Sequence, residues 1–114
     1  MWLDSYEMSK WAYWYCKKVE DKPEISKFIT DPYWSYNYCK MIKDDPLISK
    51  FITDSFWAYY YCRYIKDRSE VRKNIINSQD AYWYCRYVKD RPEIKKYINE
   101  KEFEPEVRKC IMEG

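Results

Sequence analysis

The sequence predicts an all-α protein: a short, right-handed-type α-solenoid of four helical hairpins of about 23 residues, closed by a C-terminal half-repeat. Three observations predict this fold. Cysteine recurs every 23 residues, at Cys16, Cys39, Cys62 and Cys85, a period typical of repeat proteins. Around each Cys, small and apolar residues follow the i, i+3, i+4, i+7 spacing of one helix face. Residue types that start helices also recur at equivalent positions.

The chain length suits a single domain or a short repeat array. We expect one helical repeat domain over residues 1–114. Aligning the sequence on the cysteines divides this domain into four units and two ends. These are an N-terminal extension 1–7, units 8–30, 31–53, 54–76 and 77–99, and a C-terminal cap 100–114.

Each unit opens with a helix that carries the Cys. Asp31, Asp54 and Asn77 are N-cap residue types and predict where this helix begins in the last three units. Its core face is expected to hold a small residue, a Tyr, the Cys and a Val or Ile. In the first unit these residues are Ala12, Tyr15, Cys16 and Val19, and the equivalent residues follow in the other three.

A second helix of about eight residues is predicted to complete each unit, and its short length requires stabilisation by packing. Asp followed three residues later by Glu resembles a capping box, with Asp in the Ser/Thr role. The pairs are Asp21 with Glu24, Asp67 with Glu70, and Asp90 with Glu93. The second unit, with Asp44-Asp45-Pro46-Leu47, keeps the cap and lacks the reciprocal Glu.

The two ends depart from the repeat. Residues 1–7 extend the first helix, and Trp2, Leu3 and Tyr6 are available to cover the open end of the array. Residues 105–111 match a second helix that has no first helix before it. A truncated terminal unit of this kind is typical of a capping element.

The last complete unit reads AYWYCRYVK over residues 81–89 and DRPEIKKYI over residues 90–98. This unit resembles a short helical-hairpin repeat of unknown function found in bacteria, protists and large DNA viruses. That repeat has a D-x-x-E-V helix start and a small residue at the centre of its other helix. The resemblance covers residues 8–112 or so; the family's usual glycine between units is absent here, and its aromatic content is lower. It implies a fold and no activity.

The chain lacks residues and motifs that enzymes commonly use for catalysis. The chain has no His, which is the commonest general base and metal ligand, and its one Gly, Gly114, excludes a glycine-rich phosphate loop. Cysteines one unit apart are expected roughly 9–10 Å from each other, too far for disulfides, and no C-x₂₋₄-C pair is present. We therefore expect buried, reduced thiols, Cys110 included, with no metal, no cofactor and no enzymatic activity.

A helical wheel places aromatic and basic residues on the side of each first helix opposite the core. We call this set the aromatic–basic ridge, and we expect Arg63 to lie over Tyr60 and Arg86 over Trp83. Packing under neighbouring helices is the alternative use of the ridge aromatics. The candidate partner-binding residues are Trp14, Lys17, Tyr33, Lys40, Phe56, Tyr60, Arg63, Trp83 and Arg86.

Other aromatic residues fall on the flanks of the first helices, where one unit meets the next. We expect these residues to pack between units. They are Trp11, Trp34, Trp57, Tyr64, Tyr87, Tyr13, Tyr36, Tyr59 and Tyr82.

These features favour a small protein-interaction module, an adaptor or an inhibitor, of which a phage or viral anti-defence protein is one version. Binding of single-stranded nucleic acid by aromatic stacking and phosphate contacts is the alternative, although a net charge of +2 weakens it. Self-association through the ridge is a third use. The sequence shows no signal peptide and no long apolar segment, so we expect an intracellular, cytoplasmic protein without a membrane partner.

Overall fold

The computed structural model describes residues 3–99 and residue 101, and within them all regular structure is helical, which confirms the predicted all-α class. Long and short helices alternate. The long helices are α1 (Ser5–Lys18), α3 (Pro32–Met41), α5 (Ser55–Tyr64) and α7 (Ser78–Tyr87). The short helices, of four residues each, are α2 (Pro23–Ser26), α4 (Pro46–Ser49), α6 (Ser69–Arg72) and α8 (Pro92–Lys95).

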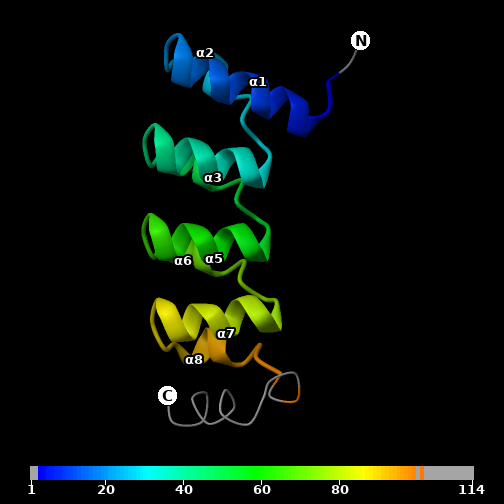
Figure 1. Ribbon diagram of the computed structural model, residues 1–114, viewed down its shortest axis with the longest axis vertical. Coiled ribbons are helices and arrows are strands. Elements are labelled where there is room, and N and C mark those ends of the chain that lie inside the picture. The colour runs from blue at the N-terminus through cyan, green and yellow to red at the C-terminus, as the bar shows by residue number, and fades with distance from the viewer. Residues whose placement is uncertain (1–2, 100, 102–114) are drawn as a thin grey trace.

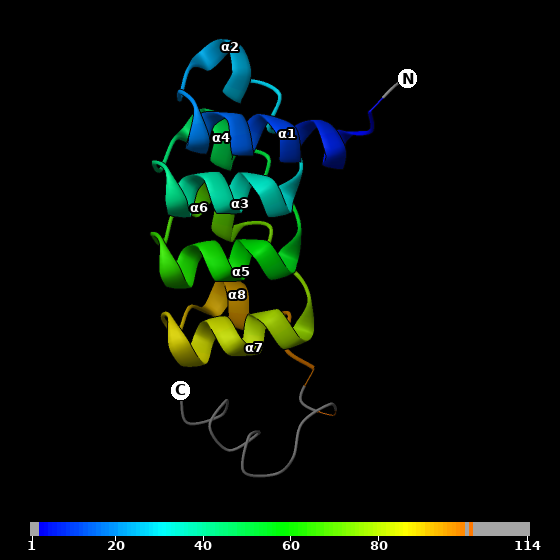
Figure 2. The same cartoon turned by 45° about the horizontal axis from the view of Figure 1, so that its top comes forward.

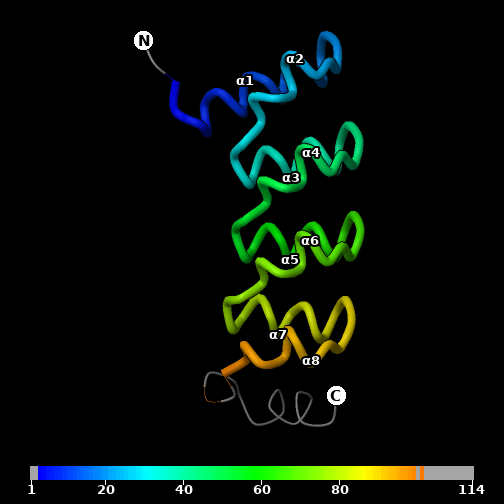
Figure 3. Tube along the Cα trace, turned by 180° about the vertical axis from the view of Figure 1, so that it is seen from behind, coloured from blue at the N-terminus to red at the C-terminus, as the bar shows by residue number. Residues whose placement is uncertain are grey.

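The long helices lie side by side in a row, each in contact with the next and with the short helix that follows it (Figures 1 and 3). The short helices lie together on one side of this row (Figure 2). The molecule measures 50 × 27 × 19 Å and has a radius of gyration of 16.3 Å. A globular domain of this length would have a radius of gyration of about 13 Å. The structure is therefore elongated along the row of helices.

The core repeats along the row. Ala58, Tyr61 and Cys62 of α5 are buried, as predicted. Ile75, which follows α6 in the same unit, is buried with them and completes one layer of the core. Equivalent residues form the other layers, where Tyr38 and Tyr84 are among the largest fully buried side chains. One position was predicted wrongly: Val19 is exposed. It is the C-cap of α1, which is the first helix within the described residues.

The predicted starts of the long helices are confirmed. Asp31, Asp54 and Asn77 each accept a hydrogen bond from a backbone N–H of the first turn. A serine at the start of the long helix then binds the backbone at the end of the same unit. The Ser55 hydroxyl accepts from the backbone N–H groups of Ile76 and Asn77, which follow the short helix of the same unit.

The second helices are shorter than predicted, and the capping boxes are wrong. The N-cap residues of α2, α6 and α8 are Lys22, Arg68 and Arg91, which form no side-chain cap hydrogen bond, and Asp45 alone caps a short helix, α4. The backbone N–H of Phe28 donates to the carbonyl of Ile25, three residues earlier. The hydrogen-bond pattern therefore changes from the α type to the 3₁₀ type after the first turn of α2. Four residues of α-helix therefore suffice before the next connection.

The recurring Asp residues bind tyrosines of the following unit. The hydroxyl of Tyr61 donates to Asp44 at 2.6 Å, and that of Tyr84 donates to Asp67 at 2.9 Å. Tyr38 and Asp21 form the same bond one unit earlier. A buried phenol needs a hydrogen-bond acceptor, and the Asp of the preceding unit supplies it. We call these contacts the inter-unit Tyr–Asp bonds.

Two arginines extend the inter-unit Tyr–Asp bonds. Arg91 donates to both the Tyr84 hydroxyl, at 2.7 Å, and the Asp67 carboxylate, at 3.1 Å; Arg68 contacts Tyr61 and Asp44 in the same way. Burial and the bond to Asp67 raise the pKa of Tyr84 to about 12. Burial opposes ionisation of Asp67, but hydrogen bonds from Tyr84, Arg72 and Arg91 outweigh it and lower the pKa of this carboxyl.

Several predictions concern residues outside those the structure describes. They are the cover provided by Trp2, the half-repeat at 105–111 within the predicted cap 100–114, and the burial of Cys110. Among the described helices, none has the length and apolar character needed to cross a membrane.

Candidate binding surface

All nine residues of the aromatic–basic ridge lie on the four long helices, and their exposure differs by residue type. The basic residues Lys17, Lys40, Arg63 and Arg86 are exposed. Among the aromatic residues, Trp14 is 40% exposed and Phe56 is 43% exposed. Tyr33, Tyr60 and Trp83 are partly buried and pack against the core. The ridge therefore combines exposed cations and exposed rings with rings that also support the fold.

The basic residues of the ridge are held by the tyrosine four residues earlier. Arg63 donates to the Tyr59 hydroxyl at 2.7 Å, and Arg86 donates to the Tyr82 hydroxyl at 2.9 Å. Residues four apart are neighbours on a helix surface, which explains the pairing. The hydrogen bond that Arg63 donates to the Tyr59 hydroxyl raises the pKa of Arg63 above its usual value.

The lysines occupy the same positions on the first two long helices. The Lys17 Nζ lies 5.8 Å from the Tyr13 ring centroid, and the Lys40 Nζ lies 5.8 Å from that of Tyr36. Lys17 also lies over Trp14, at 5.3 Å. Each of the four cations therefore contacts the tyrosine four residues earlier, the arginines at its hydroxyl and the lysines at its ring.

The predicted cation–π pair of Arg63 with Tyr60 is replaced by other contacts. The Arg63 guanidinium lies over Tyr87 of the next long helix, at 4.4 Å, and over Tyr64 of its own helix, at 5.0 Å. Arg86 lies over Tyr87, at 5.6 Å. Arg63 therefore reaches forward along the row to the Tyr87 ring while it keeps its hydrogen bond to the Tyr59 hydroxyl. Cations of the ridge thus connect successive units.

Some flank residues are buried as predicted and others are not: Tyr64 is 51% exposed and Tyr87 is 47% exposed. Tyr13, Tyr36, Tyr59 and Tyr82 are buried, and the rings of Tyr13 and Tyr36 contact a tryptophan of the next long helix. The tryptophans of the other flank differ along the row: Trp34 is buried, Trp57 is partly buried and Trp11 is exposed. In the part of the chain that the structure describes, α1 is the first long helix, so Trp11 has no earlier helix there to pack against.

Each inner tryptophan of this flank fills the space between its own helix and the one before. The rings of Trp34 and Tyr13 are 5.2 Å apart between centroids, and those of Trp57 and Tyr36 are 5.3 Å apart. The equivalent residue of α7 is Asp80. The sequence therefore has Trp at this position in three units and Asp in the fourth.

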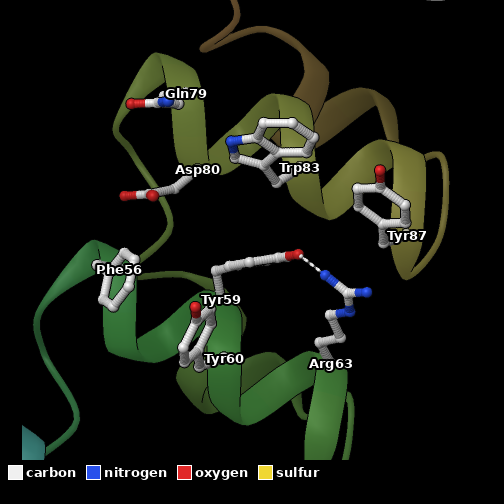
Figure 4. Close-up of a pocket in the computed structure, with 8 residues that line it drawn as sticks. All are labelled: Phe56, Tyr59, Tyr60, Arg63, Gln79, Asp80, Trp83 and Tyr87. Carbon is white, nitrogen blue, oxygen red and sulfur yellow. Dashed lines mark hydrogen bonds between the residues drawn. The ribbon is translucent and has the colours of Figure 1, made fainter.

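A pocket of about 390 Å³ opens where the tryptophan is missing, between α5 and α7 (Figure 4). Its lining includes the ridge residues Phe56, Tyr60, Arg63 and Trp83. The predicted binding residues did not include the other four that line the pocket: the flank tyrosines Tyr59 and Tyr87, the acidic Asp80, and Gln79. The break in the Trp column at Asp80 was the signal that could have identified this site.

The electrostatics of Asp80 follow from its position. Asp80 is 9% exposed. Burial raises the pKa of its carboxyl; the Ser55 hydroxyl opposes this rise through a hydrogen bond, and the Asp54 carboxylate adds to it. The pocket thus holds a carboxylate at one end and the Arg63 guanidinium at the other, with Tyr59 between them (Figure 4).

The cysteines lie in the core instead of on this surface. Cys16, Cys39 and Cys62 are buried and Cys85 is partly buried, and all four are free thiols. Burial raises the pKa of Cys39 and of Cys62 to about 12. In the described chain, no three Cys, Asp or Glu side chains are grouped so that they could hold a metal ion.

Comparisons with protein-family models, with curated proteins and with solved structures found no match for this chain.

Proposed function

We propose that the chain is a non-catalytic protein-binding module, an α-solenoid of four hairpins with a C-terminal half-repeat cap, which binds a protein partner through the aromatic–basic ridge. The observation that carries this proposal is the row of exposed cations on consecutive long helices, beside the exposed rings of Trp14 and Phe56. Arg, Trp and Tyr are the residue types that dominate binding energy in protein interfaces. An adaptor or an inhibitor, including a phage or viral anti-defence protein, is a form of this proposal.

The geometry of the cations supports a binding role. Arg63 and Arg86 are fixed by hydrogen bonds to buried tyrosines, while their side chains stay exposed. A side chain that is already ordered loses less conformational entropy when a partner binds. The ridge therefore presents prearranged charged groups at regular intervals.

A non-catalytic role is supported by the state of the groups that could carry chemistry. With pKa values of about 12, the thiols of Cys39 and Cys62 are protonated near neutral pH and are poor nucleophiles. The carboxylates of Asp21, Asp44 and Asp67 accept hydrogen bonds from tyrosines. These groups have structural partners and stabilise the contact between units.

Affinity capture from the native host tests the proposal with two matched double variants. Lys17→Glu/Lys40→Glu reverses two charges of the ridge. Lys27→Glu/Lys50→Glu reverses two exposed charges of the short-helix side in the same two units, and these lysines also lie over aromatic rings. We expect a protein that the wild type and the short-helix variant capture and the ridge variant does not. Equal capture by both variants would contradict the proposal.

Binding of single-stranded nucleic acid is the second candidate, favoured by the line of four exposed cations that runs along the row. Basic phosphate contacts beside aromatic stacking are the chemistry that such binding uses. A titration of a fluorescent oligothymidylate at low salt tests it. Affinity that falls steeply with rising salt would support this candidate. No binding at low salt would exclude it.

A further inference from the structure

The α5–α7 pocket exists because one position of the repeat changes from Trp to Asp. In the two preceding helix contacts, Trp34 and Trp57 place an indole ring against a tyrosine of the previous unit. Asp80 has a much smaller side chain at the same position and leaves that space open. The resulting volume, about 390 Å³, falls in the range typical of sites for small ligands or inserted side chains.

Aromatic rings form most of the pocket wall. Phe56, Tyr59 and Tyr60 contribute from α5, and Trp83 and Tyr87 from α7 (Figure 4). The rings support one another: Phe56 and Tyr60 lie 4.5 Å apart between centroids, and Trp83 and Tyr87 stack at 5.5 Å. The wall is therefore built before any ligand arrives. The faces of such rings carry partial negative charge and attract cations.

The charges along the pocket run from negative to positive. Asp80 is nine-tenths buried, and the neighbours that act on its carboxyl are the Ser55 hydroxyl and the Asp54 carboxylate. Neither neighbour is a cation. Arg63, at the opposite end, is directed to the Tyr59 hydroxyl and the Tyr87 ring. A buried carboxylate is costly unless a cation pairs with it.

We propose that the pocket binds a basic side chain, lysine or arginine, of the protein partner, with its cation at Asp80 and its aliphatic stem between the rings. This inference rests on the proposed binding function. An apolar side chain would fill the space but leave the buried Asp80 carboxylate without a cation, and an anionic one would be repelled by Asp80. Arg63 disfavours a cation at its own end, so the charge gradient sets the direction in which the side chain enters.

Two variants of Asp80 separate charge from volume. Asp80→Asn keeps the pocket open and removes the negative charge. Asp80→Trp restores the residue type of the other three units and fills the space. Both changes remove a buried carboxylate, so we expect thermal unfolding midpoints at or above that of the wild type. This measurement verifies that both variants fold.

Nuclear magnetic resonance titrations of the full chain test the inference, with the indole N–H signal of Trp83 as the reporter. The probes are the N-acetyl methylamides of lysine and arginine, and the controls are those of norleucine and tryptophan. We expect the basic probes to bind the wild type with millimolar dissociation constants, to bind Asp80→Asn about tenfold more weakly or worse, and to leave Asp80→Trp unperturbed. Norleucine should not bind.

Three results would overturn the inference: no binding of either basic probe, unchanged affinity for Asp80→Asn, or equal affinity for the norleucine or tryptophan probe. Because the probes report on the pocket without any protein partner, this outcome is distinguishable from failure of the proposed function. If the probes fail while the Lys17→Glu/Lys40→Glu variant still loses a captured protein, the ridge binds a partner and the pocket has no part in it.

Discussion

Removal of one hydroxyl, in Tyr84→Phe, tests whether the inter-unit Tyr–Asp bonds hold successive units together. The Tyr84 hydroxyl donates to Asp67 and accepts from Arg91, and the Tyr84 side chain is fully buried. Hydrogen bonds to charged groups contribute about 1.5–3 kcal/mol. Asp67 and Arg91 keep their direct ion pair and some solvent contact in the variant, so the lower part of this range applies. We expect a loss of about 2 kcal/mol in the free energy of unfolding.

Urea unfolding followed by circular dichroism measures this loss, and Tyr15→Phe is the matched control. Tyr15 occupies the same position on α1, and within the described residues no unit before α1 supplies an Asp. For a domain of this size the dependence of unfolding free energy on urea is about 1–2 kcal/mol per molar, so Tyr84→Phe should lower the midpoint by about 1–2 M. Tyr15→Phe should change the unfolding free energy by less than about 0.5 kcal/mol. Equal effects of the two variants would refute the reasoning.

Three further predictions concern acid, thiols and the ridge. The pKa of Asp67 is lowered in the folded state, so its contribution to stability is present above its unfolded pKa of about 4 and is lost as the pH falls through the lower, folded value. Asp67→Asn should therefore lower the urea midpoint more at pH 7 than at pH 2.5, and an equal loss at both pH values would contradict this. In a Cys110→Ser background, Cys39 should react with a thiol reagent at pH 8 far more slowly than the partly buried Cys85. Mass spectrometry of the labelled peptides measures the two rates, and equal rates would contradict the burial of Cys39. Trp14→Ala truncates a ring that is 40% exposed and should lower the unfolding free energy, measured by urea titration, by less than about 1 kcal/mol. Truncation of a core aromatic costs about 3–5 kcal/mol, and a loss in that range would show that Trp14 is a packing residue.

The positions of the long helices could be predicted from the sequence because their signals are local. N-cap residues such as Asp31 bind N–H groups two or three residues away, and the core face follows helix periodicity. The burial of Tyr61 and Cys62 follows from that periodicity alone. Local patterns of this kind give the residues that face inward with no knowledge of the neighbouring unit.

The role of the recurring Asp residues could not be predicted in this way. The Asp67-Arg68-Ser69-Glu70 segment has the pattern of a capping box, yet Asp67 accepts a hydrogen bond from Tyr84, 17 residues later. The capping box and the inter-unit contact both require the Asp67 carboxylate. The carboxylate binds the buried Tyr84 hydroxyl, which needs an acceptor. The prediction failed because the capping box was judged from one unit at a time.

The ridge shows a similar division. Its exposed cations were placed correctly by the helical wheel, whereas the direction of Arg63 toward Tyr87 depends on the distance between α5 and α7. The pocket depends on the same distance and on the absence of an indole at Asp80. Comparing equivalent positions of the four units, and noting where one unit differs from the others, indicates the position of the pocket.

The central claim is that a partner binds along the aromatic–basic ridge, and a nuclear magnetic resonance titration of the labelled chain with the captured partner tests it most directly. We predict changes at the indole N–H groups of Trp14 and Trp83 and little change at the backbone amides of α2 and α4, on the short-helix side. Changes centred on α2 and α4, with both indole signals unmoved, would contradict the claim.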